Sequence, residues 1–409
     1  MSPHRGACVA AAVLATAGAA VAAWAVQRWV RARWLGASAT GGASAQPPPR
    51  GTRAEAAARE RDARRAGAKD RRRARRAASR EAQWRAASEL AAVNPGVKKR
   101  ERAFEPGADL SAHNAWDAVP WDTALEAQTV RDASAQPAAP DAAVRRVRAQ
   151  SDAMWDAFYR TNLLAYKHRR YLHAEFPELA ELGAARPGGA AGAAGAEGAS
   201  ALVLEIGCGP GNAALPLLAQ FPALRVCASD ISPQAVRLLA THPAFPPERC
   251  SACVWDVADA SGALPAGVRE GEADAALLVF ALSALPPDAF ARAARNVFRA
   301  LMPGGVLLFR DYGVSDEKQR KFTRAGTKLG ERWYARQNGT MVYFFDTAEV
   351  DALFAACGFE PVPPRADGSG GGGGSASFDK LLTVNRKTGA RLWRVWVSAR
   401  YRKPAERNF

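Results

Sequence analysis

The chain has 409 residues, of which 48% are apolar and 23% charged, so it can bury a sizeable core and is not disordered throughout. Its six cysteines are too few for a disulfide-stapled secreted module of this length. The formal net charge of +16 comes almost entirely from residues 1–100, which carry 21 Lys and Arg against 6 Asp and Glu. Residues 101–409 are nearly neutral, so a local basic patch must hold any nucleic acid they bind.

Residues 1–35 contain an apolar stretch, residues 7–26, that is about as long as a helix that spans a bilayer. Most of the stretch is alanine, and basic residues flank it on both sides. Three interpretations stay open: a weak membrane anchor that leaves the C-terminal bulk of the chain in the cytosol, a transit sequence for a mitochondrion or plastid, and a cleaved secretory peptide. A membrane contact through residues 7–26 is therefore a hypothesis, and the compartment stays open.

Shifts in composition divide the rest of the chain. Residues 36–100 form a basic low-complexity arm, which is either a solvated spacer or an electrostatic contact for RNA or membrane. Residues 101–182 form a region that we expect to cap the substrate and cofactor site, and residues 183–200 are a glycine and alanine linker. Residues 201–409 form the main domain, which includes a glycine-rich loop at 368–375.

Apolar strand candidates alternate with amphipathic stretches of helix length from residue 201 onward. The strand candidates are Leu202–Ile206, Arg225–Ser229, Ala252–Trp255, Ala275–Ala281 and Val306–Phe309, and the helix candidates are Ala213–Gln220, Pro233–Leu239 and Ala289–Leu301. This alternation predicts an α/β fold, a parallel sheet with helices on both faces. A helix near 350–356 and strand candidates near 359–362 and 392–399 follow, and they indicate a closing antiparallel hairpin.

The first strand candidate runs into a glycine loop that indicates the cofactor. Residues 205–212 read Glu-Ile-Gly-Cys-Gly-Pro-Gly-Asn, and Gly207 and Gly209 allow a sharp turn beneath a nucleotide-like ligand. The spacing does not match the Gly-x-Gly-x-x-Gly of dinucleotide sites. Glu205 would repel a pyrophosphate but suits the cationic methionine part of S-adenosylmethionine. The loop therefore favours S-adenosylmethionine over a nicotinamide cofactor.

Two further carboxylates follow the next two strand candidates. Asp230 ends the second strand, where a carboxylate can accept both ribose hydroxyls, and Asp256 follows the third, where it or a neighbour can reach the adenine amino group. Either residue alone could be a helix cap or a turn residue. Their order on successive strand ends supports the nucleoside site.

Beyond the glycine loop, the chain resembles the tRNA N3-methylcytidine methyltransferases. Residues 155–159 read Trp-Asp-Ala-Phe-Tyr, residues 309–313 read Phe-Arg-Asp-Tyr-Gly, and residues 336–340 read Arg-Gln-Asn-Gly-Thr. Residues 113–117, His-Asn-Ala-Trp-Asp, are similar to the segment that marks the threonine-tRNA branch of that family. The resemblance covers most of residues 100–409.

The resemblance implies an S-adenosylmethionine-dependent enzyme that forms N3-methylcytidine at position 32 in the anticodon loop of tRNA, with threonine tRNA as substrate. It implies the class I methyltransferase (Rossmann-like) fold, a mostly parallel seven-stranded sheet with a C-terminal antiparallel hairpin and an extra N-terminal helical region. We expect a monomer, and the need for a tRNA-presenting protein stays open. The cofactor contacts implied for this chain are Trp155, Tyr159, Gly207, Asp230, Asp256 and Val279.

The chain departs from the family pattern at two positions. His168 stands between Lys167 and Arg169 where the family has aspartate, and Asn338 stands in the Arg-Gln-Asn-Gly-Thr motif where the family again has aspartate. Each change removes an acidic side chain, and its effect stays open.

The implied reaction needs positioning more than acid–base chemistry, because cytosine N3 carries a free lone pair at neutral pH. The base must be unpaired and turned out, since N3 lies on its Watson–Crick edge. A carboxylate that binds the exocyclic amine would stabilise the positive charge that develops on the ring. We predict that Asp311 has this role and that Arg310 and Tyr312 frame the base. The alternative is that Arg310 and Asp311 form a structural ion pair.

A basic and aromatic cluster before the sheet is the predicted tRNA contact. Lys167, Arg169 and Arg170, followed by Tyr171, can hold loop phosphates and stack a base, and Arg336 is assigned to the substrate as well. The alternative is a solvated helix face. No metal site is predicted, because Cys250-x-x-Cys253 has no second ligand pair.

Two other functions stay open at this stage. The first is a class I methyltransferase that acts on another RNA or on a protein. The second is an inactive, membrane-tethered RNA-binding module with a methyltransferase fold, which the intact glycine loop, Asp230 and Asp256 argue against.

Overall fold

The computed structural model describes residues 119–163, 165–184, 200–362, 375–385 and 388–405, with isolated positions between residues 67 and 116. The chain divides into two compact units, residues 1–90 and 91–409, and the fold described below belongs to the second. Residues 7–26 and the glycine-rich loop at 368–374 lie outside the described residues. Within those residues, no helix combines the length and the apolar character needed to cross a bilayer. The predicted domain boundaries stay predictions.

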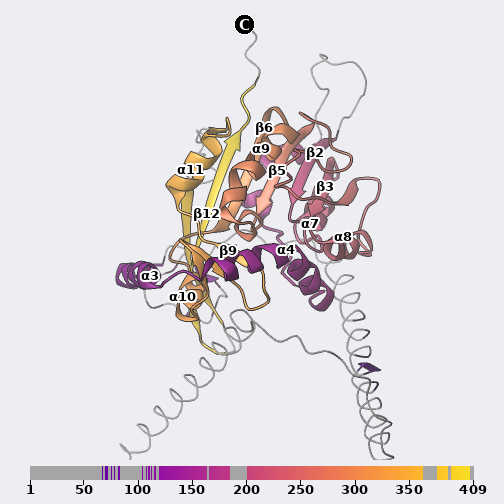
Figure 1. Ribbon diagram of the computed structural model, residues 1–409. Helices are drawn as coiled ribbons and strands as arrows, with labels where there is room; N and C mark the ends of the chain where they lie inside the picture. Colours follow the sequence, from indigo (N-terminus) through magenta and orange to yellow (C-terminus); the bar gives the residue numbers. More distant parts are fainter. Residues whose placement is uncertain are drawn as a thin grey trace, which may run out of the picture. The chain divides into compact units, whose positions relative to one another are not determined.

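The second unit is built on one mixed β-sheet, shown in Figure 1. Its main strands are β2 (Ala201–Ile206), β3 (Leu224–Asp230), β4 (Cys250–Val254), β5 (Ala273–Val279), β6 (Leu301–Tyr312), β11 (Ser377–Val384) and β12 (Arg391–Arg402). They lie in the order β11-β12-β6-β5-β2-β3-β4. Strands β2 to β6 pair in parallel, while β12 is antiparallel to both β6 and β11. This arrangement confirms the predicted class I fold with its C-terminal hairpin.

Helices cover both faces of this sheet because its strands are apolar on both sides. On one face, Val203, Val226 and Leu308 pack in a core cluster with α5 (Leu172–Glu175), α6 (Glu178–Gly183) and α7 (Ala214–Gln220). On the other face, Phe309 of β6 contacts Phe354 of α11 (Thr347–Ala355), and α9 (Phe290–Ala300) lies nearby. The remaining helix of the alternating region is α8 (Pro233–Ala240), which packs beside β4.

The hairpin differs from its prediction in one strand. Residues 359–362 contribute only β10 (Glu360–Pro361), which pairs with β12 near Tyr401. The partner that completes the hairpin is β11, on the other side of the glycine-rich loop. A further two-residue strand, β1 (Ala115–Trp116), pairs with β11 at the sheet edge.

A small second sheet, absent from the prediction, follows β6. It consists of β7 (Lys328–Gly330), β8 (Trp333–Ala335) and β9 (Met341–Tyr343) in antiparallel order. Helix α10 (Glu317–Arg324) precedes it, and two short 3-10 turns, η1 (Leu282–Ala284) and η2 (Pro287–Ala289), follow β5. These pieces extend the carboxyl edge of the parallel strands.

Two N-terminal helices complete the unit. Helix α3 (Thr123–Ala135) is capped at its start by Asp122, which accepts a hydrogen bond from the Leu125 amide at 2.9 Å. At its end, Lys328 Nζ donates to the carbonyls of Ala133 and Gln136, which satisfies helix acceptors that lack partners within the helix. Helix α4 (Asp141–Thr161) lies across the carboxyl ends of the parallel strands (Figure 1), where the candidate site is found.

Candidate active site

The glycine loop after β2 has a backbone that requires glycine. Gly207 and Gly209 have φ values of +68° and +54°, in the left-handed region that other residues rarely adopt. A Cβ added to Gly207 would lie 2.8 Å from the Cβ of Ala281, and one added to Gly209 would lie 2.9 Å from the Tyr159 hydroxyl oxygen. The loop therefore packs closely against Ala281 and Tyr159, and a side chain at either glycine would clash with them.

A first cavity of about 100 Å³ opens between this loop, α4 and the ends of β3 and β4. Its lining is Ser151, Asp152, Trp155, Tyr159, Ile206, Gly207, Asp230, Ile231, Trp255, Asp256, Val257, Phe280, Ala281, Ala284 and Leu285. Five of the predicted cofactor residues line it: Trp155, Tyr159, Gly207, Asp230 and Asp256. Residues far apart in the sequence thus meet at one strand-end site.

Asp230 lies at the floor of the first cavity and holds the glycine loop in place. Its two carboxylate oxygens accept hydrogen bonds from the amides of Gly209, at 2.8 Å, and Ser232, at 2.9 Å. Burial raises the pKa of this carboxyl to about 6, against the effect of those two bonds. Each oxygen keeps a lone pair for a ligand hydroxyl.

Glu205 lies behind the loop and does not line the cavity. It is buried in β2, and burial raises the pKa of its carboxyl to about 7. Its Oε2 atom has no hydrogen-bond partner among the described residues. This oxygen is a free acceptor beside the loop, and a cationic group such as the methionine part of S-adenosylmethionine would satisfy it. The contact stays a prediction, because Glu205 does not line either cavity.

Val279, the remaining predicted cofactor residue, is buried at the end of β5 and lines neither cavity described here. Its carbonyl accepts a hydrogen bond from Arg169 Nη1 at 3.2 Å. It therefore contributes through its backbone, by holding Arg169.

Asp156 fastens α4 over the first cavity, a role that the sequence reasoning missed. It accepts hydrogen bonds from the Ser232 hydroxyl at 3.0 Å and the Gln234 amide at 2.9 Å, both at the start of α8. Because the carboxylate sits at a helix N-terminus, it also compensates unpaired amides there. This contact fixes the face of α4 that carries Trp155 and Tyr159.

We expect Asp156→Ala to weaken S-adenosylmethionine binding by about tenfold, since it removes two hydrogen bonds that hold the cavity wall. Titration calorimetry measures this effect, and thermal unfolding checks that the variant is folded. Asp141→Asn, at the exposed start of the same helix, is the control and should bind as the wild type does. Equal affinity in both variants would contradict the role of Asp156.

A second, larger cavity of about 360 Å³ adjoins the first. Its lining is Trp155, Tyr159, Tyr166, Lys167, His168, Arg169, Tyr171, Gly207, Cys208, Gly209, Asn212, Phe280, Tyr312, Arg336, Arg394 and Trp396. The two cavities share Trp155, Tyr159, Gly207 and Phe280. No acidic residue of the described chain lines the second cavity, whereas four cationic side chains do. It therefore suits an anionic ligand with aromatic rings.

Most of the predicted substrate residues line this second cavity. Lys167, Arg169, Arg336 and Tyr312 are brought together there from three places in the sequence, whereas Arg170 does not line it. The guanidinium of Arg336 lies 5.6 Å from the ring centre of Trp155, in the shared wall. The predicted cluster is thus largely assembled.

The structure shows the surroundings of the two residues that depart from the family pattern, His168 and Asn338. His168 lines the second cavity, and burial together with the Arg170 charge lowers the pKa of its imidazole, which favours the neutral form. Asn338 Oδ1 accepts hydrogen bonds from the amide and hydroxyl of Thr340, at 3.3 and 2.8 Å. An aspartate oxygen would accept the same bonds, so asparagine preserves this turn.

Arg310 does not frame the second cavity. It is fully buried, pairs with Glu175 and Asp379, and donates to the Ser398 hydroxyl at 2.6 Å. Its guanidinium also lies 4.7 Å from the ring centre of Trp396. It is therefore a structural residue that joins α5, β11 and β12. The predicted alternative, an ion pair between Arg310 and Asp311, is not formed, because the partners of Arg310 are Glu175 and Asp379.

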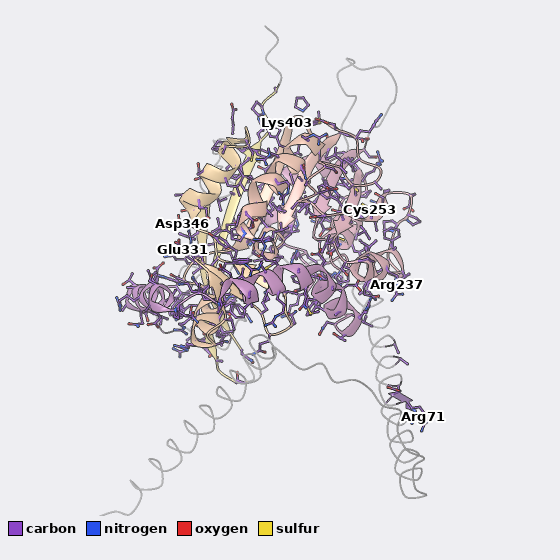
Figure 2. All side chains as sticks on the ribbon, viewed as in Figure 1. Arg71, Arg237, Cys253, Glu331, Asp346 and Lys403 are labelled. Carbon is purple, nitrogen blue, oxygen red and sulfur yellow. The ribbon has the colours of Figure 1, made fainter. Side chains whose placement is uncertain are left out.

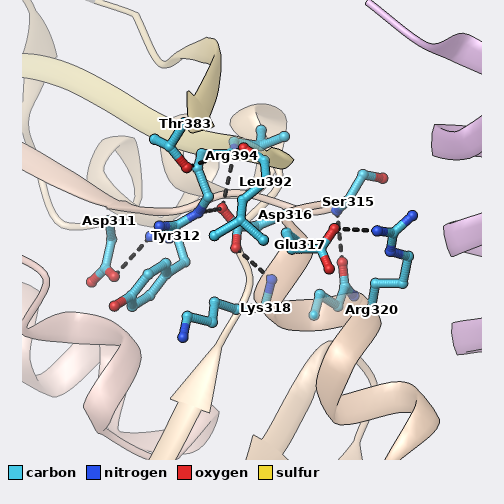
Figure 3. Close-up of polar contacts among 12 residues, drawn as sticks. Asp311, Tyr312, Ser315, Asp316, Glu317, Lys318, Arg320, Thr383, Leu392 and Arg394 are labelled. Carbon is cyan, nitrogen blue, oxygen red and sulfur yellow. Dashed lines mark hydrogen bonds and ion pairs between the residues drawn. The ribbon is translucent and has the colours of Figure 1, made fainter. Parts of the chain in front are cut away.

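Asp311 is also fully buried and is not among the described residues that line either cavity. One oxygen accepts the Ser283 amide at 2.9 Å, and the other accepts the amide of Tyr312 at 2.8 Å, as Figure 3 shows for Tyr312. Burial raises the pKa of this carboxyl to about 6. Through these two bonds Asp311 positions the wall of the site, and its predicted contact with the base stays a prediction.

Phe280 is a site residue that the sequence analysis placed only within the strand candidate Ala275–Ala281. It has φ of +56°, which is strained for a residue with a Cβ, and it lines both cavities. Its ring lies 5.0 Å from that of Tyr312 and 5.7 Å from that of Trp396. Its position directly after an apolar strand, at the carboxyl edge, was the available signal.

The Cys250-x-x-Cys253 pair lies on the edge strand β4, and Cys253 is labelled in Figure 2. Cys250 is buried and Cys253 half-buried, and both are free thiols. Over the part of the chain that the structure describes, no group of His, Cys, Asp and Glu side chains is arranged to hold a metal ion.

The strand order, the glycine loop and the strand-end carboxylates define a class I S-adenosylmethionine-dependent methyltransferase, and residues 166–363 match the family described as a methyltransferase domain. The chain belongs to the tRNA N3-methylcytidine methyltransferase family. It is 33% identical, over 74% of its length and 87% of the relative, to tRNA N(3)-methylcytidine methyltransferase Mettl2 of Drosophila melanogaster. It is 35% identical to tRNA N(3)-cytidine methyltransferase METTL2 of Danio rerio, over 71% of this chain and 85% of that one. The protein is therefore a tRNA cytidine-N3 methyltransferase.

The name of a third relative specifies a tRNA and a nucleotide position, and a solved structure has a similar fold. The chain is 32% identical to the tRNA(Thr) (cytosine(32)-N(3))-methyltransferase of Saccharomyces cerevisiae, over 74% of this chain and 45% of that one. Among solved structures, it is similar to 1,6-didemethyltoxoflavin-N1-methyltransferase of Burkholderia thailandensis, with 20% identity, a TM-score of 0.40, and coverage of 66% of this chain and 94% of that one.

We expect S-adenosylmethionine binding to weaken about tenfold between pH 7 and pH 5. The pKa of Asp230 in the free protein is about 6, so the carboxylate that we predict to accept ribose hydroxyls is mostly protonated at pH 5. Because this pKa lies above its unfolded value, ionised Asp230 also costs the free protein stability at neutral pH, and acidification relieves that cost. Calorimetry at both pH values measures the change, and Asp230→Asn should remove the part centred near pH 6. A dissociation constant that is equal at both pH values contradicts this expectation.

Proposed function

We propose that this enzyme methylates N3 of cytidine 32 in the anticodon loop of threonine tRNA. The name of the budding-yeast relative supports this choice of tRNA and position. The segment 113–117, similar to that of the threonine-tRNA branch, also supports it, and its Ala115 and Trp116 form β1 against β11. Trp116 also packs against Leu382 and Val384 of β11, and its indole donates to the Leu110 carbonyl at 3.0 Å.

The observation that carries the proposal is the junction of the two cavities. One cavity has the strand-end carboxylates of a nucleoside site, and the other has aromatic rings and cations. Their shared wall of Trp155, Tyr159, Gly207 and Phe280 is the place where a methyl donor and a base would meet. S-adenosylmethionine supplies the methyl group when it is bound in the first cavity.

The residues of the chain contribute mainly binding and orientation. Asp230 and Asp256 hold the nucleoside end of the cofactor, and the faces of Trp155 and Tyr159 cover its positive charge and exclude water. Phe280 and Tyr312 offer rings against which a pyrimidine can stack. Cytosine N3 attacks with its own lone pair, so no side chain needs to remove a proton before methyl transfer, and correct placement supplies the rate.

The proposal is tested by incubating the purified full chain with labelled S-adenosylmethionine and total tRNA, followed by nucleoside mass analysis. We expect N3-methylcytidine, recovered from the anticodon loop of threonine tRNA. A threonine tRNA transcript with uridine at position 32 is the matched control and should stay unmodified. A methyl group on another nucleoside or on another tRNA contradicts the assignment. Activity of the chain alone also decides whether a tRNA-presenting protein is required.

The predicted monomer, the RNA contact of residues 36–100 and the membrane contact of residues 7–26 remain part of the proposal. Deletion of residues 1–100 tests the arm, because loss of the 21 basic residues in the deleted segment should lower tRNA affinity and the salt dependence of binding if the arm contacts RNA. Unchanged tRNA binding would make the arm a spacer.

A further inference from the structure

Aromatic rings and guanidinium groups alternate along one wall of the second cavity. In order of contact they are Trp155, Arg336, Tyr312, Arg394 and Trp396. The distances from guanidinium to ring centre along this series are 5.6, 5.7, 6.0 and 5.5 Å. We call these five residues the cation–ring series. Each neighbouring pair is close enough for a cation–π contact.

The sheet itself positions the last three residues of this series. Tyr312 of β6 lies directly opposite Trp396 of β12, and Arg394 precedes Trp396 by two residues, so all three project from one face. The guanidinium of the buried Arg310 also contacts the Trp396 ring, and Arg310 is itself held by Glu175 and Asp379. The wall is therefore built on strands and is not a loop surface.

Arg394 is held by a buried carboxylate. Asp316 is fully buried, and its Oδ2 accepts hydrogen bonds from Arg394 Nε at 2.8 Å and from the Val395 amide at 2.9 Å, while Oδ1 accepts the Lys318 amide at 2.7 Å and so caps α10. Figure 3 shows this arrangement. The pair uses only Nε, and no second carboxylate of the described residues forms an ion pair with Arg394. Its terminal nitrogens are thus available to a ligand.

The cations around this point outnumber the acids. Arg336, Arg394 and Lys318 lie near one another, and two acidic side chains interact with them, Asp316 with Lys318 and Asp311 with Arg336. Burial is the main cause that lowers the pKa of Lys318, and the neighbouring charges of Arg394 and Lys321 lower it further. A cavity wall with surplus cations and no acidic lining is built to receive an anion.

We propose that Arg394, held in place by Asp316, binds a phosphate of the tRNA backbone next to the target cytidine, while the rings of the cation–ring series stack the bases beside it. Guanidinium is the side chain best suited to a phosphate, because its planar donors match two phosphate oxygens. Alternating rings and cations also match the stacked bases and phosphates of a single strand. The inference rests on the proposed function, since it assumes that the anticodon loop enters the second cavity.

The matched pair of variants Arg394→Ala and Arg269→Ala tests this proposal. Both remove one positive charge, but the Arg269 side chain is 87% exposed, pairs with Glu272 and does not line the cavity. We expect Arg394→Ala to raise the KM for tRNA, and its dissociation constant, about tenfold or more, with kcat within about threefold. The slope of log affinity against log salt should fall by roughly 0.7, the value of one single-strand phosphate contact. Arg269→Ala should leave all of these as in the wild type.

Asp316→Asn tests the positioning role. It keeps one oxygen, which can accept one of the two backbone amides, but loses the charge that holds Arg394, so the KM for tRNA should rise and the salt slope should fall, both by less than in Arg394→Ala. Arg394→Lys should recover part of the affinity, since it keeps the charge without the planar donors. Calorimetry with S-adenosylmethionine checks that each variant is folded, and the dissociation constant of the cofactor should be the same as in the wild type.

The outcomes separate this inference from the proposed function. If Arg394→Ala binds and methylates tRNA as Arg269→Ala does, Arg394 is no phosphate contact, and the inference is overturned although the wild type forms N3-methylcytidine. If Arg394→Ala instead loses cofactor binding, the residue is structural, and the inference is again overturned. If the wild type forms no N3-methylcytidine on any tRNA, the proposed function itself fails.

Discussion

Replacing Asp230 by alanine should weaken S-adenosylmethionine binding by on the order of a hundredfold and remove measurable methyl transfer at cofactor concentrations that saturate the wild type. Two hydrogen bonds from ribose hydroxyls to a carboxylate are lost, and hydrogen bonds to charged groups contribute about 1.5–3 kcal/mol each. The variant also releases the amides of Gly209 and Ser232, so the glycine loop loses its anchor. Calorimetry measures the affinity.

Glu248→Gln is the control for this variant, because it also removes one carboxylate charge but lies on the surface, where its side chain is 66% exposed. It should bind the cofactor as the wild type does. Wild-type affinity in Asp230→Ala would mean that the cofactor lies elsewhere. Circular dichroism checks that the variant is folded. If it is not, Asp230→Asn replaces it, and we expect that variant to lose at least tenfold in affinity for S-adenosylmethionine.

Replacing Asp311 by alanine should lower kcat by on the order of a hundredfold while the cofactor dissociation constant changes by less than about threefold. The carboxylate holds the amides of Ser283 and Tyr312, and Tyr312 lines the second cavity. Loss of both bonds lets this wall shift, and displacement of a reacting group by even 1 Å is costly in rate. Single-turnover methylation with saturating tRNA measures the effect.

Asp311→Asn separates position from charge. Its amide oxygen can accept one of the two backbone bonds, so a purely positional role predicts a kcat between those of the wild type and Asp311→Ala. A kcat as low as that of Asp311→Ala would instead mean that the negative charge itself stabilises the cationic base. Full turnover in Asp311→Ala would show that the residue has no part in the reaction.

The alternating region of the fold could be predicted because its signals are local. The strands β2 to β6 are apolar runs separated by amphipathic helices, and the five predicted strands match them within a few residues at most ends. Strand β11 was missed because it follows the glycine-rich loop and carries Asp379 and Lys380 in its middle, so it lacks a continuous apolar run. The three-residue strands of the small sheet are too short to show a period.

The site could be predicted only in part, for a similar reason. Asp230 and the glycine loop are next to their strands in the sequence, so strand order alone brings them together. Arg310 was placed beside the substrate because of its neighbours in the sequence, but its partners Glu175 and Asp379 are 135 and 69 residues away. The contact of Asp316 with Arg394 spans 78 residues and crosses from α10 to β12, which no local pattern indicates.

A crystal structure with bound S-adenosylhomocysteine tests the central claim most directly, which is that the donor and the base meet at the shared wall of Trp155, Tyr159, Gly207 and Phe280. We predict that the ribose lies on Asp230, the adenine lies near Asp256, and the sulfur atom faces the second cavity. A ligand bound outside the first cavity, or one whose sulfur faces away from the second, would contradict the account.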